Sequence, residues 1–110
     1  MSTLSTHVLD TSLGTPARGI RVTLERAADG ASLGTGVTDA DGRIAELPAL
    51  RGPLVAGEYR LRFAVAEYFA TTGRDTFYSE IVVAFRVAVD QHYHVPLLLS
   101  PFGYATYRGS

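Results

Sequence analysis

The sequence predicts an all-β protein, a sandwich of eight short strands with one short helix. Two segments, residues 19–26 and 58–65, alternate apolar and polar side chains, as strands with one buried face do. A third, residues 80–89, is an almost continuous apolar run rich in β-branched side chains, which favours a strand. Turn residues separate these segments at short intervals, so we expect one sheet-rich domain over residues 1–110.

The first half of the chain is predicted to supply four strands. Asp-Gly pairs at residues 29–30 and 41–42 are turn dipeptides, and a loop rich in Ser, Gly and Pro occupies residues 11–18. In the first strand His7 and Leu9 lie on one face, because side chains two apart point the same way. In chain order the strands are predicted at residues 4–10, 19–26, 31–38 and 43–47.

The second half is predicted to supply the other four strands and the helix. A loop with two prolines covers residues 48–57. Helix formers over residues 66–72, followed by Gly73 as a C-terminal cap, predict one or two helical turns. A turn at residues 100–103 joins the last two strands into a hairpin. The strands are predicted at residues 58–65, 80–89, 92–99 and 104–107.

The final hairpin concentrates polar groups. On its first strand His92 and His94 share one face, while the opposite face is apolar. The returning strand brings Arg108 and Ser110 back toward the histidines. The sequence therefore predicts two imidazoles, a guanidinium and a terminal carboxylate in one neighbourhood.

Composition argues against several classes of function. The chain has no cysteine, which excludes disulfides and thiolate metal sites, and the expected location is the cytoplasm. The formal net charge is −1 and the ten basic residues are all arginine without a basic run, so neither nucleic acid nor a membrane surface is expected as a partner. The N-terminal segment lacks the features of a signal peptide, and no stretch approaches the ~20 apolar residues of a membrane span.

Three segments carry a resemblance to a known family, and their sequences are LSTHVLDTSLGTPARGI, TDADGR and HYHVPLLLSPFGYATYRGS. With these segments the chain resembles the transthyretin-like 5-hydroxyisourate hydrolases of urate degradation, and the final YRGS is what separates those hydrolases from the hormone-carrying transthyretins. The resemblance implies two four-stranded sheets with a helix between the fifth and sixth strands, assembled as a homotetramer. It also implies hydrolysis of 5-hydroxyisourate to 2-oxo-4-hydroxy-4-carboxy-5-ureidoimidazoline, with no cofactor and no required metal.

The resemblance also implies which residues form the site. STHVLD aligns His7, and YHVP aligns His94, with the catalytic histidines of the family, while TDADGR places Arg43 as its substrate-binding arginine. The expected catalytic residues are His7, His94 and Ser110, and the expected substrate-binding residues are His7, Arg43, Tyr107, Arg108 and Ser110.

The chemistry of the implied reaction accounts for these residue types. Opening a ring at an amide-type C–N bond needs a base for water, donors for the oxygen that becomes negative, and a clamp for a flat heterocycle. Histidine titrates near neutral pH and suits the first task. The planar fork of arginine suits the other two. Ser110 is expected to hydrogen-bond substrate or water.

Four alternatives stay open at this stage. Ser110 as a covalent nucleophile is a rival mechanism, although no G-x-S-x-G surrounds it. His7, His92 and His94 supply as many imidazoles as some catalytic zinc sites, although nothing else in the sequence fixes them around one ion. A transthyretin-type carrier, or a purely structural sandwich, would show no turnover. A carrier is disfavoured because the polar groups of His7, Arg43 and His94 are costly to desolvate against an apolar ligand.

Overall fold

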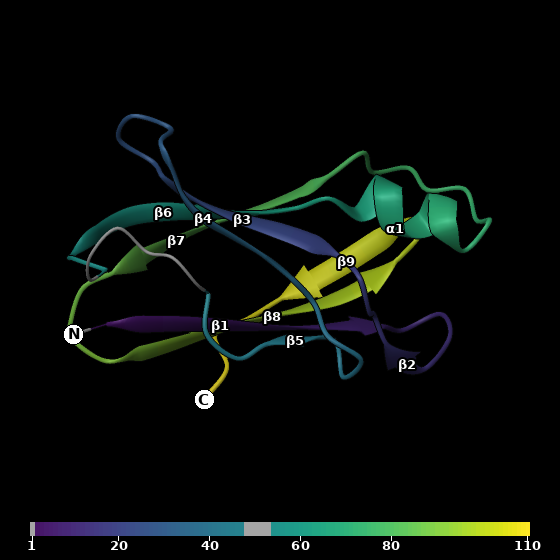
Figure 1. The fold of residues 1–110 in the computed structure, drawn as a ribbon, viewed down its shortest axis with the longest axis horizontal. Coiled ribbons are helices and arrows are strands. Elements are labelled where there is room, and N and C mark those ends of the chain that lie inside the picture. The colour runs from purple at the N-terminus through teal and green to yellow at the C-terminus, as the bar shows by residue number, and fades with distance from the viewer. Residues whose placement is uncertain (1, 48–53) are drawn as a thin grey trace.

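The structure is a sandwich of two β-sheets with one short helix at one end (Figure 1). It is a computed structural model that describes residues 2–47 and 54–110. Over these residues the elements are β1 (Thr3–Asp10), β2 (Thr15–Pro16), β3 (Arg21–Arg26), β4 (Ser32–Val37), β5 (Arg43–Ile44), β6 (Gly57–Phe63), α1 (Val65–Thr71), β7 (Ile81–Val87), β8 (His92–Ser100) and β9 (Gly103–Thr106). One sheet has the order β2-β1-β8-β9, with β5 also paired to β1, and the other has the order β4-β3-β6-β7.

All eight predicted strands are present, and β2 is a ninth inside the predicted loop at residues 11–18. It pairs with Leu9 and Asp10 of β1, so the first sheet has five strands rather than the four implied by the resemblance. Two residues are too few to show an alternation, which is why no strand was expected there. The strand predicted at residues 43–47 is only the two-residue β5, and the loop predicted at 48–57 lies mostly outside the described residues.

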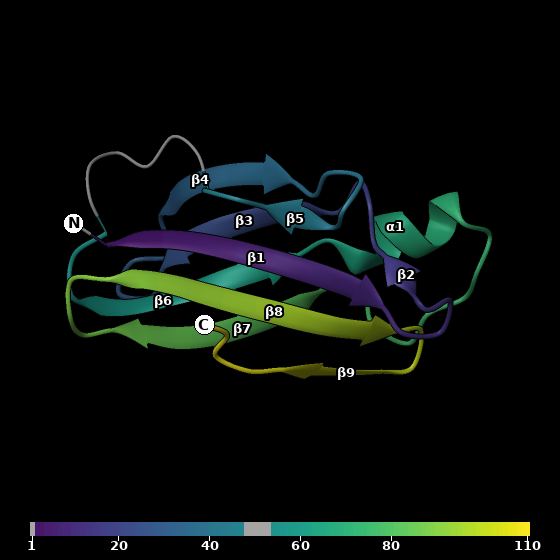
Figure 2. The same cartoon turned by 90° about the horizontal axis from the view of Figure 1, so that it is seen from below.

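Strands β1 and β8 form the centre of the first sheet and run parallel, paired from Thr3 with His92 to Asp10 with Leu99. Side chains of matching position therefore point to the same face of both strands. The inner face is buried and apolar, as predicted; its β8 residues are Tyr93, Val95, Leu97 and Leu99. Figure 2 shows β1 and β8 side by side on one outer surface of the sandwich. That outer surface carries His7 and His94.

The second sheet supplies the other half of the core. The predicted alternation is confirmed in β3, which buries Val22 and Leu24, and in β6, which buries Leu61 and Phe63. The apolar run at residues 80–89 forms the predicted strand, β7, but this strand is fully buried only at its two ends. The physical reason is position: β7 is the edge strand of its sheet, so its middle lies at the rim of the sandwich.

Helix α1 follows β6 directly, and it begins at Val65, which was predicted to end the preceding strand. Its C-terminus is a Schellman motif: Gly73 has φ +68°, its N–H donates to the Ala70 carbonyl, and the Arg74 N–H donates to the Phe69 carbonyl. Gly73 is therefore confirmed as the cap. Over the described ranges no helix is long and apolar enough to cross a membrane.

Asp10, fully buried at the end of β1, ties the first sheet to the helix region. Its carboxylate accepts hydrogen bonds from Tyr68 Oη at 2.7 Å, Arg74 Nη2 at 2.5 Å and Ser12 Oγ at 2.7 Å. Burial alone would raise the pKa of Asp10, but these hydrogen bonds together hold it well below its usual range. Burial and the neighbouring Asp10 carboxylate raise the pKa of Tyr68 to about 12. The charged group therefore anchors the end of β1.

Candidate active site

A polar cavity of about 260 Å³ lies on the outer face of the first sheet, across β1, β5 and the start of β8. We call it the outer cavity; its polar lining residues are Ser5, Thr6, Arg43, His92, His94 and Ser110. The parallel register sets Ser5 opposite His94, and the β1–β5 pairing sets Arg43 opposite His7. Segments far apart in the sequence therefore meet at this surface.

The turn at residues 39–42 delivers Arg43 to the edge of β1. Asp39 Oδ1 accepts hydrogen bonds from the backbone N–H groups of Asp41 and Arg43, each at 2.9 Å. Gly42 has φ +74°, and its carbonyl oxygen accepts a hydrogen bond from Val8 N–H at 2.7 Å. A Cβ at residue 42 would lie 2.3 Å from the Val8 carbonyl oxygen, so this position needs glycine for both space and conformation.

The Ser5 hydroxyl lies between two imidazoles. Its Oγ is 2.7 Å from Nε2 of His92 and 2.7 Å from Nδ1 of His94. On the far side of His92, Nδ1 lies 2.5 Å from Oγ1 of Thr3. Because Nδ1 of His94 already hydrogen-bonds Ser5, only Nε2 of that ring is left to bind a ligand or water. No described residue hydrogen-bonds this Nε2.

The electrostatics of the outer cavity favour a neutral base. Burial lowers the pKa of His94, and the electrostatic effects of the nearby His7, Arg43 and His92 lower it further. His94 is therefore neutral at pH 7 and able to accept a proton. Hydrogen bonds from backbone N–H groups, that of Arg43 foremost, lower the pKa of Asp39 and keep its carboxylate charged.

The end of the chain closes one side of the outer cavity. After β9, the Gly109 N–H donates a hydrogen bond to the carbonyl oxygen of His94 at 2.8 Å, which confirms the predicted return of the hairpin. A Cβ at residue 109 would lie 2.5 Å from Cδ2 of His94 and 3.1 Å from Cγ of Pro96. Glycine therefore lets the backbone lie against the imidazole and sets Ser110 at the cavity.

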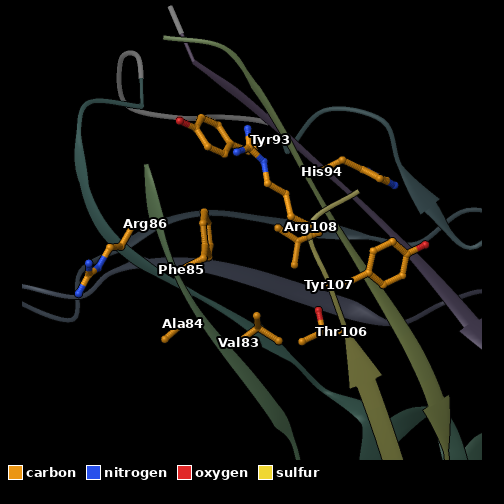
Figure 3. A pocket seen from close by; sticks show the side chains of 10 residues that line it. Val83, Ala84, Phe85, Arg86, Tyr93, His94, Thr106, Tyr107 and Arg108 are labelled. Atoms are coloured by element: carbon orange, nitrogen blue, oxygen red, sulfur yellow. The ribbon is translucent and has the colours of Figure 1, made fainter. Parts of the chain in front are cut away.

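Arg108 lies on the other side of β8. Its guanidinium carbon is 4.8 Å from the centre of the Tyr93 ring, which is a cation–π contact. Figure 3 shows Arg108, Tyr93 and Phe85 pointing to one side, whereas Tyr107 and His94 point to the other. A second cavity of about 330 Å³ spans the gap from β7 to β8 and β9 here. We call it the edge cavity; its lining includes Val83, Phe85, Tyr93, Tyr107 and Arg108, and also His94, which therefore lines both cavities.

The structure thus brings together four of the six predicted site residues, which are His7, Arg43, His94 and Ser110. Tyr107 and Arg108 line the edge cavity instead, and neither enters the outer cavity, although Figure 3 shows the Tyr107 ring directed away from the guanidinium of Arg108. A role for Arg108 in substrate binding stays a prediction.

Two residues of the site were missed by sequence reasoning, Ser5 and Asp39. Ser5 precedes His7 by two positions in a strand, so period-two alternation already places both on one face. Asp39 precedes Arg43 by four positions and opens the turn, and Asp in that place commonly bonds the backbone that follows. Both signals were present in the sequence.

The three imidazoles are not gathered around one point. His92 and His94 are joined through the Ser5 hydroxyl, and His7 lies opposite Pro96 on the neighbouring strand. Within residues 2–47 and 54–110, no group of three or more His, Cys, Asp or Glu side chains is placed to hold a metal ion.

Comparison with known proteins agrees with this architecture. Residues 4–109 match the model of the HIUase/Transthyretin family. The 5-hydroxyisourate hydrolase of Caulobacter vibrioides is 47% identical, and the alignment covers 100% of both chains. The solved structure of Klebsiella pneumoniae 5-hydroxyisourate hydrolase has a TM-score of 0.89 at 44% identity, covering 100% of this chain and 94% of that one. Sea bream transthyretin in complex with thyroxine has a TM-score of 0.85 at 34% identity, covering 96% and 93%. The chain therefore belongs to the HIUase/Transthyretin family and has its transthyretin-like fold.

Proposed function

We propose that this chain hydrolyses 5-hydroxyisourate to 2-oxo-4-hydroxy-4-carboxy-5-ureidoimidazoline, a step in urate degradation. The observation that carries the proposal is the outer cavity, where His94, Arg43 and Ser110 converge beside His7. The names of the Caulobacter and Klebsiella relatives, both 5-hydroxyisourate hydrolases, support it. The proposed unit is one domain over residues 1–110, working in the cytoplasm without a cofactor or metal.

His94 is the base in this proposal. Its Nε2 carries no hydrogen bond from a described residue, and its lowered pKa keeps it neutral at pH 7, so it can take a proton from an attacking water. His7 shares the outer face and helps move that proton to the leaving nitrogen of the ring. Positive groups around the water favour its ionised form and therefore assist the attack.

Arg43 binds and polarises the substrate. Its guanidinium donates hydrogen bonds in one plane, which suits the carbonyl oxygens at the edge of a flat heterocycle. Ser110 and Tyr107 approach from the end of the chain and hydrogen-bond substrate or water. Arg108 serves as a second clamp in this proposal, although its guanidinium stacks on Tyr93 in the folded chain.

A carrier function is the second candidate, because the transthyretin of sea bream binds thyroxine on the same fold. The outer cavity disfavours it. Two histidines, an arginine and three hydroxyl-bearing residues line that cavity, and covering their polar groups with an apolar ligand costs several kcal/mol where no hydrogen bond replaces water.

We further propose a homotetramer in which a second subunit closes the outer cavity. The cavity is open on the outer surface of the first sheet, and large apolar side chains are exposed near the paired ends of β1 and β8, Leu13 at 55% and Phe102 at 71%. Exposed apolar side chains of this size favour association. A monomeric variant of normal fold that keeps full turnover would contradict this arrangement.

The test of the function is the disappearance of freshly generated 5-hydroxyisourate, followed by ultraviolet absorbance. Added protein is expected to accelerate the decay, and a folded His94→Ala variant is expected to lose most of that acceleration. An equal rate with and without wild-type protein rejects the hydrolase, and thyroxine binding in the same sample would then point to the carrier.

A further inference from the structure

Ser5 differs from the other residues of the outer cavity because its hydroxyl bonds two titratable groups at once. Its Oγ lies 2.7 Å from Nε2 of His92 and 2.7 Å from Nδ1 of His94. Ser5 is only 7% exposed, so water competes little for this hydroxyl. Thr3 Oγ1 also lies 2.5 Å from Nδ1 of His92. The side chains therefore form a hydrogen-bonded row in the order Thr3, His92, Ser5 and His94, and this row ends at the outer cavity.

A serine hydroxyl carries one proton, so the neutral row has two arrangements in which Ser5 donates that proton to one of the two imidazoles. In the first, Ser5 donates to His92 and accepts from a protonated Nδ1 of His94, so that Nε2 of His94 keeps its lone pair. In the second, Ser5 donates to Nδ1 of His94 and accepts from a protonated Nε2 of His92. His94 then carries its proton on Nε2. The first arrangement presents a base to the cavity and the second presents an acid.

We propose that Ser5 and His92 are positioning residues that act through His94. They hold Nε2 of His94 unprotonated in the resting protein, and they take up through the Ser5 hydroxyl the proton that His94 accepts. The part they play in turnover rests on the hydrolase function proposed above, whereas the state of His94 is a property of the protein alone.

The proton transfer balances bond by bond. An O–H bond of water breaks, its oxygen bonds the substrate carbon, and its proton bonds Nε2 of His94. The Nδ1 proton of His94 passes to Ser5 Oγ, while the Ser5 hydroxyl proton passes to Nε2 of His92. When the C–N bond breaks, the Nε2 proton of His94 passes to the leaving nitrogen, and the proton held by His92 returns through Ser5 to Nδ1 of His94, so the resting arrangement is restored.

The charges around His94 favour this transfer. Arg43 of β5 and His7 of β1 face it across the outer surface, His92 lies beside it on β8, and Ser110 lines the same cavity. A positive charge on His94 is repelled by Arg43 and is partly desolvated. His92 is exposed, so water stabilises the charge once the proton has moved there.

The first experiment measures the tautomer of His94 without substrate, from the ¹⁵N chemical shifts of its ring nitrogens at a pH where it is neutral. The wild type is expected to carry the proton on Nδ1. Ser5→Ala removes the bridge and is expected to shift the population toward a proton on Nε2, and Ser5→Thr is expected to restore the wild-type state. Ser32→Ala, at an exposed serine of β4, is the matched control and should leave the shifts unchanged. A wild type with its proton on Nε2, or equal shifts in wild type and Ser5→Ala, overturns the inference.

The second experiment measures turnover of 5-hydroxyisourate as a function of pH. Ser5→Ala is expected to lower kcat about 10-fold with KM nearly unchanged, because a misplaced proton weakens general-base catalysis. Ser5→Thr should recover most of that loss. His92→Gln can hydrogen-bond but cannot store a proton, so it is expected to lower kcat and change the pH profile. A profile equal to that of the wild type overturns the relay.

The two experiments separate this inference from the proposed function. Wild-type protein that shows no turnover, but whose His94 tautomer depends on Ser5, supports the positioning role and rejects the hydrolase. Wild-type protein that turns over at the same rate as Ser5→Ala keeps the hydrolase and overturns the positioning role.

Discussion

The outer and edge cavities both reach His94 of strand β8, and they differ in chemistry more than in size. The edge cavity is the larger, about 330 Å³ against about 260 Å³, and aromatic and aliphatic side chains dominate its lining. The outer cavity joins a neutral imidazole to a guanidinium and hydroxyls. Tyr93 and His94 are consecutive in the chain, yet their rings point to opposite sides of the strand (Figure 3).

This contrast shows that volume does not mark the site here. Both cavities contain an arginine, but Arg108 in the edge cavity stacks on an aromatic ring, whereas Arg43 in the outer cavity lies near two histidines. A base with a lowered pKa beside fixed positive charge is typical of a catalytic centre. His94 lines both cavities, whereas the period-two alternation of β8 keeps Tyr93 in the edge cavity alone.

Substitutions on either side of β8 should produce the largest difference. His94→Ala is expected to lower kcat by about 10²–10⁴-fold, because it removes the general base. Phe85→Leu, in the edge cavity, is expected to leave kcat within a few-fold of wild type. The measurement is 5-hydroxyisourate decay with circular dichroism as a check on folding. Greater harm from the folded Phe85→Leu variant would move the chemistry to the edge cavity.

Two glycines of the terminal hairpin allow a finer comparison. Gly109→Ala places a methyl group 2.5 Å from His94 Cδ2, so the imidazole must move. Because displacements of about 1 Å at a reacting group can cost about 100-fold, we expect a loss of that order in kcat. Gly103→Ala is the matched control: its Cβ meets only Ser100 Oγ, at 3.6 Å, and activity should remain. Equal activity of both variants would show that His94 is not held against residue 109.

Much of this geometry was predictable from local pattern. Alternation in β8 placed His94 and Tyr93 on opposite faces, and the Pro-Gly turn at residues 100–103 returned the chain to the histidines, as the bridge from Gly109 to His94 confirms. Each of these features depends on residues close together in the sequence, where backbone periodicity and turn chemistry are sufficient.

The parallel pairing of β1 with β8 could not be predicted from alternation, since it joins residues nearly ninety positions apart. That register alone places Ser5 between His92 and His94. The path of Arg108 was also beyond prediction, because a chain leaving its last strand can turn a side chain to either face. Its cation–π contact with Tyr93 decides between them in the folded protein.

The two arginines give the next comparison. Arg43→Lys is expected to lower kcat/KM about 10- to 100-fold, because one ammonium cannot reproduce a planar, charge-assisted pair of hydrogen bonds. Arg108→Lys keeps the charge and is expected to have the smaller effect, since its guanidinium lies in the edge cavity. The measurement is kcat/KM for both variants on one substrate preparation. A larger loss from Arg108→Lys would mean that the C-terminal segment moves when substrate binds.

The smallest changes in kcat are expected when the pH is lowered. Burial and neighbouring positive groups lower the pKa of His94, so the base stays neutral, and kcat should hold, down to below about pH 6.5. Asp10 differs, because it contributes to folding and not to chemistry. Its folded pKa lies below the unfolded value of about 3.9, so its stabilisation is present above that pH and is lost as the pH falls further.

Asp10→Asn tests whether these two acid responses are independent. The substitution removes the charge that Arg74 and Tyr68 bind, and we expect a loss of about 2 kcal/mol in unfolding free energy at pH 7. It should also flatten the decline of that free energy below pH 4, because no carboxylate at this position remains to be protonated. The acid limb of kcat should not move. Urea denaturation and turnover, each measured across pH, provide the data. An acid limb that shifted with Asp10→Asn would show that the anchor of β1 also sets the protonation of His94.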